Sequence, residues 1–123
     1  MKTASRILVF GSDQVLTELV VVALSGLDAE VRVVSDRIAF ERITGRMVFD
    51  LVLLLDLEPL LSGRNFFRRL RPRPLHRPEI YLLAHHQRAE TVLAMLECGI
   101  DQYLTIPLNL SRLRGKVIAA LGR

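Results

Sequence analysis

The apolar run 51–55, Leu-Val-Leu-Leu-Leu, constrains the fold of this chain more than any other feature. Asp50 precedes the run, and Asp56, Pro59 and Gly63 follow it. A strand that is apolar on both faces is typical of the centre of a parallel sheet, where helices cover both sides. The run therefore predicts a central strand over 50–55, whose carboxyl end lies where open α/β sheets place their functional sites.

Similar short apolar runs recur and alternate with stretches of helical periodicity. Candidate N-caps of the helices are Ser12 or Asp13, Ser35 or Asp36, and Asn109. Strands are predicted over 6–10, 30–34, 50–55, 79–84 and 101–106, and helices over 12–26, 37–45, 63–70, 88–98 and after residue 109. Five strand-then-helix units without a linker predict a single α/β domain over residues 1–123. Its core is a doubly wound five-stranded parallel sheet.

Composition and motifs exclude several classes of protein. Neither a Gly-x-Gly-x-x-Gly fingerprint nor a phosphate-binding loop follows the first strand, so nothing supports nucleotide binding. The one cysteine, Cys98, excludes an internal disulfide and suits a reducing compartment. No apolar run approaches the roughly 20 residues that cross a bilayer, and the N-terminus lacks the apolar stretch of a signal peptide. We expect a cytoplasmic protein that uses no cofactor and contacts no membrane.

The positive charge of the chain is concentrated in one segment. The net charge is +4, and 15 of the 17 basic residues are arginine. The segment 64–77 contains no acidic residue and carries six of these arginines: Arg64, Arg68, Arg69, Arg71, Arg73 and Arg77. Such a cluster can attract a nucleic-acid backbone or an acidic partner. The alternative interpretation is a solvated helix end and loop.

The order of elements carries a family resemblance. Asp50 opens the third predicted strand, Pro59 and Gly63 follow it, "GIDQYLTIP" covers the fifth strand, and a capped helix closes the chain. In these features the whole chain resembles a bacterial two-component response-regulator receiver domain. The resemblance implies a flavodoxin-like (βα)5 fold with strand order 2-1-3-4-5, and a site at the carboxyl ends of the strands.

Receivers hold Mg²⁺ with an acid pair after strand one and accept phosphate on an aspartate that ends strand three. A hydroxyl residue ends strand four, and a lysine precedes the proline after strand five. Hard oxygen ligands and a cation are what this chemistry needs. Matched to this pattern, the chain has apolar or small residues at those positions: Gly11 and Ser12 with Asp13 beside them, Leu55, Leu83 and Ile106. The resemblance therefore implies a degenerate pseudo-receiver that lacks the phosphoacceptor aspartate.

Other candidate residues receive simpler interpretations. Asp56 stands one residue past the acceptor position, and because strand side chains alternate we expect it to point away from the site. His76 is separated by an extended strand from His85 and His86, so we expect no metal site. The resemblance places Tyr103 at the family's switch-aromatic position, where we expect one fixed pose. It also implies a cis peptide bond before Pro107.

We therefore predict a phosphorylation-independent signalling module rather than an enzyme. In the family, the fourth helix, fifth strand and fifth helix form the docking surface. The resemblance therefore implies that residues 88–121 bind a protein partner or a second copy of the chain. One alternative is the regulatory domain of a DNA- or RNA-binding regulator whose output domain lies beyond Arg123, or direct nucleic-acid contact through the arginines of 64–77. Another is a ligand binder or enzyme of flavodoxin type.

Overall fold

The computed structural model describes residues 5–55, 78–85 and 88–122. The described strands form one parallel sheet in the order β2-β1-β3-β4-β5, as predicted. Their bounds are β1 Ser5–Phe10, β2 Ala29–Val34, β3 Leu51–Leu55, β4 Glu79–His85 and β5 Gln102–Ile106. These bounds differ from the predicted ones by at most one residue at each end. The doubly wound α/β fold class is therefore confirmed.

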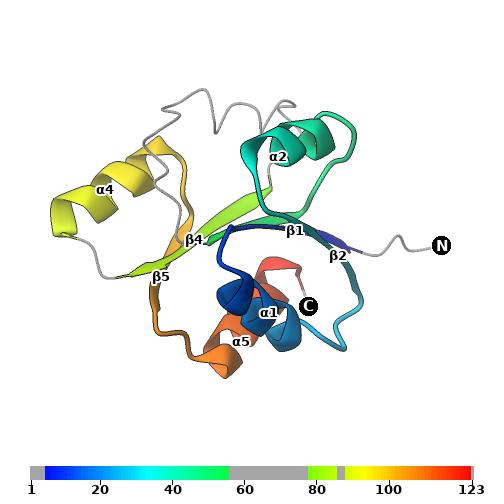
Figure 1. The fold of residues 1–123 in the computed structure, drawn as a ribbon. Helices are drawn as coiled ribbons and strands as arrows, with labels where there is room; N and C mark the ends of the chain where they lie inside the picture. The colour runs from blue at the N-terminus through cyan, green and yellow to red at the C-terminus, as the bar shows by residue number, and fades with distance from the viewer. Residues whose placement is uncertain (1–4, 56–77, 86–87, 123) are drawn as a thin grey trace.

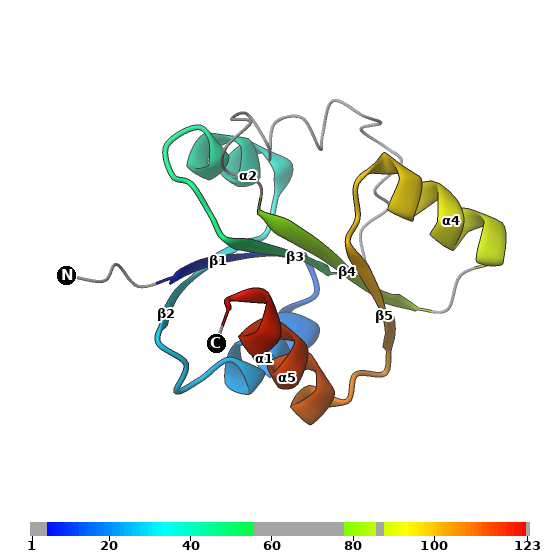
Figure 2. The same cartoon turned by 180° about the vertical axis from the view of Figure 1, so that it is seen from behind.

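Helices cover both faces of the sheet (Figures 1 and 2). The four described helices are α1 Gln14–Ala23, α2 Arg37–Thr44, α4 Ala89–Cys98 and α5 Leu110–Ala120. Helices α2 and α4 lie on one face, and α1 and α5 lie on the other. The predicted helix over 63–70 falls outside the described residues. Within the described part of the chain, no helix has the length and hydrophobicity to cross a membrane.

Local sequence signals explain where the helices begin and end. Asp13 and Asp36, rather than the serines before them, are the N-caps, and their carboxylates accept backbone N–H groups of α1 and α2. Asn109 caps α5 in the same way. The first helix is shorter than the predicted 12–26. It stops at Ala23 because the chain turns there into Gly26, whose φ of 81° is a backbone conformation that favours glycine.

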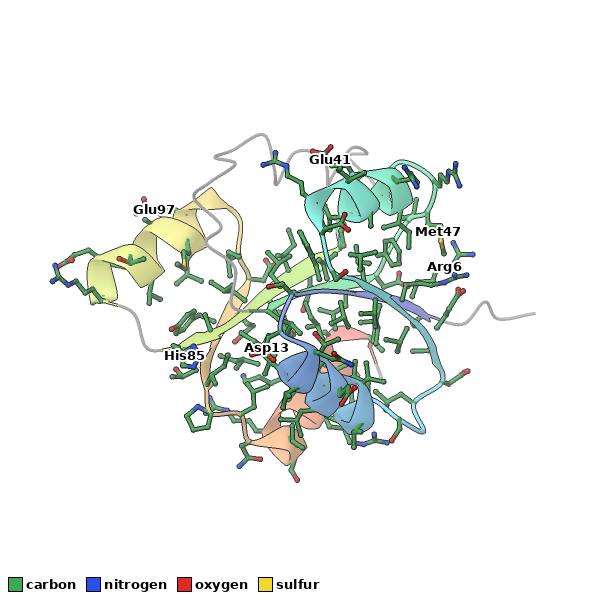
Figure 3. The ribbon with its side chains drawn as sticks, viewed as in Figure 1. Arg6, Asp13, Glu41, Met47, His85 and Glu97 are labelled. Carbon is green, nitrogen blue, oxygen red and sulfur yellow. The ribbon has the colours of Figure 1, made fainter. Side chains whose placement is uncertain are left out.

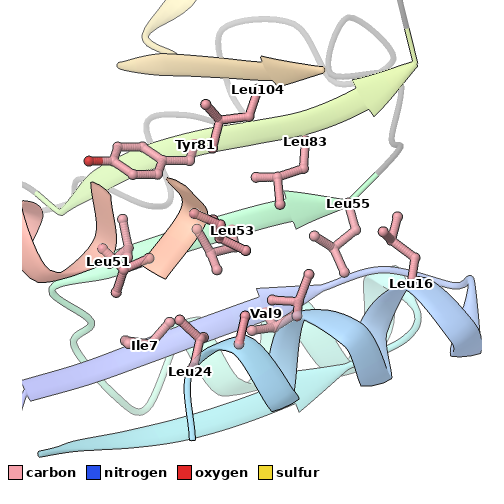
Figure 4. Packing of buried hydrophobic residues seen from close by; sticks show 14 residues of the cluster. Ile7, Val9, Leu16, Leu24, Leu51, Leu53, Leu55, Tyr81, Leu83 and Leu104 are labelled. Carbon is pink, nitrogen blue, oxygen red and sulfur yellow. The ribbon is translucent and has the colours of Figure 1, made fainter. Parts of the chain in front are cut away.

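The core consists of two apolar clusters, one on each face of the sheet. Every residue of β3 is at most 1% exposed. Side chains alternate along the strand, so Val52 and Leu54 pack into the cluster on the α2/α4 face, while Leu51, Leu53 and Leu55 pack into the cluster on the α1/α5 face (Figure 4). The carboxyl end of β3 is therefore as inaccessible to solvent as its middle.

Two aspartates fasten the opposite end of the sheet. Asp50, directly before β3, accepts the Arg6 backbone N–H at 2.8 Å. Asp101, directly before β5, accepts the Ile80 backbone N–H at 2.7 Å. Each carboxylate thus continues the hydrogen bonding between adjacent strands by one step, and bonds to a charged acceptor are stronger than neutral ones. Asp50 therefore has a structural role at the amino ends of the strands, opposite the candidate site.

Candidate functional site

The segment after β1 holds the first three residues of the candidate site. Gly11 is buried, and its N–H donates to the Val34 carbonyl oxygen at 3.1 Å. Ser12 and Asp13 are exposed. The Asp13 carboxylate accepts the Leu16 backbone N–H at 3.0 Å, which is the capping bond of α1. The one acid here is therefore already engaged in holding the start of a helix (Figure 3).

The residues at the ends of β3 and β4 close the site with hydrocarbon. Leu55 and Leu83 are partners in the sheet register and are 1% and 0% exposed. Both belong to the α1/α5 cluster, where Figure 4 shows them pointing into the same apolar space as Leu16. Ile106, at the end of β5, is half-buried and packs against this cluster. The structure thus brings Leu55, Leu83 and Ile106 into one apolar cluster.

The described residues at these strand ends do not fit Mg²⁺. This ion needs several hard oxygen ligands in a near-octahedral arrangement. Gly11 has no side chain, and a Cβ added there would lie 2.7 Å from the Leu55 Cβ, so the space of one ligand is taken. No three His, Cys, Asp or Glu side chains form a possible metal site in the described part of the chain. His76 and His86 lie outside the described residues.

Tyr103 lies on the other face of the sheet. Its half-buried ring packs against the α2/α4 cluster, and its hydroxyl donates to the His85 carbonyl oxygen at 2.5 Å. The ring is thereby tied to the end of β4, whose position is labelled by His85 in Figure 3. The Ile106–Pro107 peptide bond is cis, the conformation that the family resemblance implies. Asp56 and all six arginines of 64–77 fall outside the described residues.

Comparison with known proteins places the chain in a family. Residues 7–118 match the family described as the response regulator receiver domain. The chain belongs to the response-regulator receiver family. Over 90 residues this receiver is 37% identical to the response regulator protein PmrA of Pseudomonas aeruginosa, a match that covers 73% of the receiver and 40% of PmrA. The matched part thus spans less than half the length of that relative.

Solved structures give the same fold. The BeF3-activated DrrB receiver domain is 25% identical, with a TM-score of 0.78 and coverage of 98% of this receiver and 100% of that chain. A response regulator from Thermotoga maritima has a TM-score of 0.83 at 18% identity, with coverage of 98% and 100%. HP1043, an orphan response regulator of H. pylori, has a TM-score of 0.80 at 18% identity, with coverage of 98% and 99%. The last two show the likeness of the fold alone.

Two structural contacts were missed by the sequence analysis. The Tyr81 hydroxyl donates to the carboxylate of Glu79 on the same strand, β4, at 2.9 Å and to the carbonyl oxygen of Lys116 on α5 at 3.4 Å. Arg114 of α5 donates to the carbonyl oxygens of Ala23 and Ser25, at 3.0 and 2.6 Å, and so caps the end of α1. The contacts with α5 depend on how this helix packs against β4 and the end of α1, and no local sequence motif predicts them.

Proposed function

We propose that this receiver domain signals without phosphorylation, as a pseudo-receiver that acts by protein–protein interaction or dimerisation. The observation that carries the proposal is Leu55, a buried hydrocarbon side chain at the position that the family resemblance assigns to the phosphoacceptor. Its described neighbours Gly11 and Leu83 carry neither a carboxylate nor a hydroxyl that could take its role. The proposed function requires no cofactor and no catalytic residue.

The substitutions are energetically consistent with one another. A lysine at position 106 without an anion to pair with, or a hydroxyl at 83 without a partner, would incur a desolvation penalty of several kcal/mol. Leu83 and Ile106 avoid it. Among the described residues, no buried side-chain nitrogen or oxygen lacks a hydrogen-bond partner. The site therefore resembles a hydrophobic core, in which all polar groups have partners, more than an ion-binding pocket.

Beryllofluoride, a phosphoryl mimic, tests the proposal directly. When it is added with Mg²⁺ to the ¹⁵N-labelled chain, the amide resonances of Asp13 and Leu55 are expected to stay in place. The DrrB receiver domain, which has been solved in its BeF3-activated form, is the positive control. Saturable shifts at both residues, dependent on Mg²⁺ and beryllofluoride together, would show that the site accepts a phosphoryl group and would refute the proposal.

The surface formed by residues 88–121 is the proposed docking site. On α4 the side chains of Leu93 and Leu96 are 59% and 41% exposed, while Met95 faces the core. Exposed leucines on one helix supply apolar area that a partner can bury. Tyr103, on the adjacent strand β5, donates its hydroxyl hydrogen to the His85 carbonyl oxygen, and this bond supports the proposal of one fixed pose that needs no phosphate. We propose that this surface binds a protein partner or a second copy of the chain.

Replacing Leu93 by glutamate is expected to weaken association through this surface at least tenfold, because a buried interface would then have to desolvate a charge. Sedimentation velocity over a range of protein concentrations measures self-association. Val22→Glu is the matched control, since Val22 is a similarly exposed apolar residue (62%) on α1, which lies on the other face of the sheet. Weakening by Val22→Glu and not by Leu93→Glu would move the interface to α1.

A second candidate function is the regulatory domain of a DNA- or RNA-binding regulator. It is favoured by the match to PmrA, because more than half of that response regulator lies outside the matched part. In this case an output domain would follow Arg123, or the arginines of 64–77 would contact nucleic acid themselves. Direct contact predicts DNA binding that falls steeply with salt and is weakened by Arg71→Ala and Arg73→Ala. Binding that is independent of salt and of these arginines would exclude it.

A further inference from the structure

The main chain after β1 approaches β3 unusually closely. The β1–β3 pairing ends at Phe10 and Leu54. The next residue, Gly11, donates its N–H to Val34 of β2. An ideal Cβ built on Gly11 would lie 2.7 Å from the Leu55 Cβ, and real Cβ atoms essentially never come within 3.0 Å of a heavy atom outside their own and the neighbouring residues. The end of β1 therefore has no room for a side chain on this side.

The atom that sets this limit is the Cβ of Leu55, not the end of its side chain. The Leu55 Cδ1 and Cγ atoms are farther from the added Cβ, at 3.1 and 3.2 Å. Every residue except glycine has a Cβ, so shortening Leu55 to alanine leaves the closest contact in place. Gly11 is not among the described glycines with positive φ. Its restriction therefore comes from packing and not from its backbone dihedral angles.

We infer that the close approach of the two main chains excludes a carboxylate at position 11, whatever residue other than glycine stands at position 55. The inference rests on the proposed function and deepens it. In this site both the side chains present and the spacing of the main chains are incompatible with the acid pair that the family keeps after strand one. Restoring an acid at position 11 would require the ends of β1 and β3 to separate.

A double-mutant cycle tests the inference. Gly11→Ala is introduced into the wild type, the Leu55→Ala variant and the Leu55→Gly variant, and the unfolding equilibrium constant is measured in urea. Overpacking is expected to raise this constant about tenfold or more in the first two backgrounds. In the Leu55→Gly background, which alone removes the Cβ, the increase is expected to stay under about threefold. A stabilising osmolyte at fixed concentration keeps all variants folded at the start of the titration.

Gly115→Ala is the matched control, because Gly115 lies in α5 and an added Cβ would have no atom within 4 Å. It is expected to lower the unfolding constant about fivefold, since alanine favours helix. Hydrogen exchange of the residue-11 amide, which bonds to the Val34 carbonyl oxygen, gives a second readout and should accelerate in Gly11→Ala. A neutral Gly11→Ala, or equal rescue by Leu55→Ala and Leu55→Gly, would overturn the inference. Neither the cycle nor the exchange uses phosphate, so their failure leaves the proposed function standing.

Discussion

Leu55→Asp is expected to lower the free energy of unfolding at pH 7 by about 3 to 5 kcal/mol, and not to create a phosphate acceptor. The side chain at this position is 1% exposed and packs in the α1/α5 cluster, beside Gly11 and Leu83. An aspartate there would lose the apolar packing of leucine and would place a carboxylate among hydrocarbon groups. Urea unfolding measures the loss.

The loss should depend on pH. Burial raises the pKa of a carboxyl group, so the folded variant would hold its proton at a pH where the unfolded chain has released it. The stability of Leu55→Asp should therefore fall as the pH rises above about 4 and recover as it is lowered. Leu55→Met, which conserves volume, is the control and is expected to lose less than about 1.5 kcal/mol. A Leu55→Asp variant as stable as Leu55→Met at pH 7 would show that this end of the sheet is open to water.

Tyr81→Phe is expected to destabilise the protein at neutral pH and to stabilise it at strongly alkaline pH. At neutral pH the variant loses the bonds from the Tyr81 hydroxyl to Glu79 and to Lys116 of α5, at a cost of about 1 kcal/mol. Burial, and then the Glu79 carboxylate that accepts the hydroxyl hydrogen, raise the pKa of Tyr81 above its ordinary value. The folded state therefore keeps this proton more tightly than the unfolded state does.

The sign of the alkaline effect follows from linkage. Below about pH 10 both states are protonated and the contribution is complete. As the pH rises further, the unfolded chain ionises first, and the wild type loses up to about 1.4 kcal/mol for each pH unit. The Tyr81→Phe variant has no such loss, so the stability curves of the wild type and the variant should cross at about pH 11. Parallel curves from pH 7 to 12 would mean that Tyr81 ionises as freely in the fold as in the unfolded chain.

The sequence was sufficient to predict the fold because the decisive signals are local and periodic. The unbroken apolar run of β3 identifies a strand covered on both faces, and the acids at 13 and 36 set the starts of two helices. Position along the chain also places Leu55 at the end of β3. In each case the pattern and the structure depend on the same short-range geometry.

The remaining features depend on distances between segments that are far apart in the sequence. From the sequence and the family resemblance, Gly11 is identified as the replacement of an acidic residue. Its contact with Leu55 depends on how closely the chain after Phe10 approaches β3. The roles of Asp101 and Tyr81 likewise arise only when β5 and α5 are packed against β4. Aspartate before a strand is a signal that could have identified the first, whereas a buried tyrosine carries none.

The charges on the outer strand β2 limit how the sheet can grow. Glu30 pairs with Arg6 at 3.2 Å and with Arg32 at 2.7 Å. Charged side chains on an outer strand discourage the addition of another strand, because the new neighbour would bury them. At the β2 edge, copies of this domain are thus protected from the edge-to-edge strand pairing that leads to aggregation. A partner that binds at this edge must do so through side-chain contacts and not by adding a strand to the sheet.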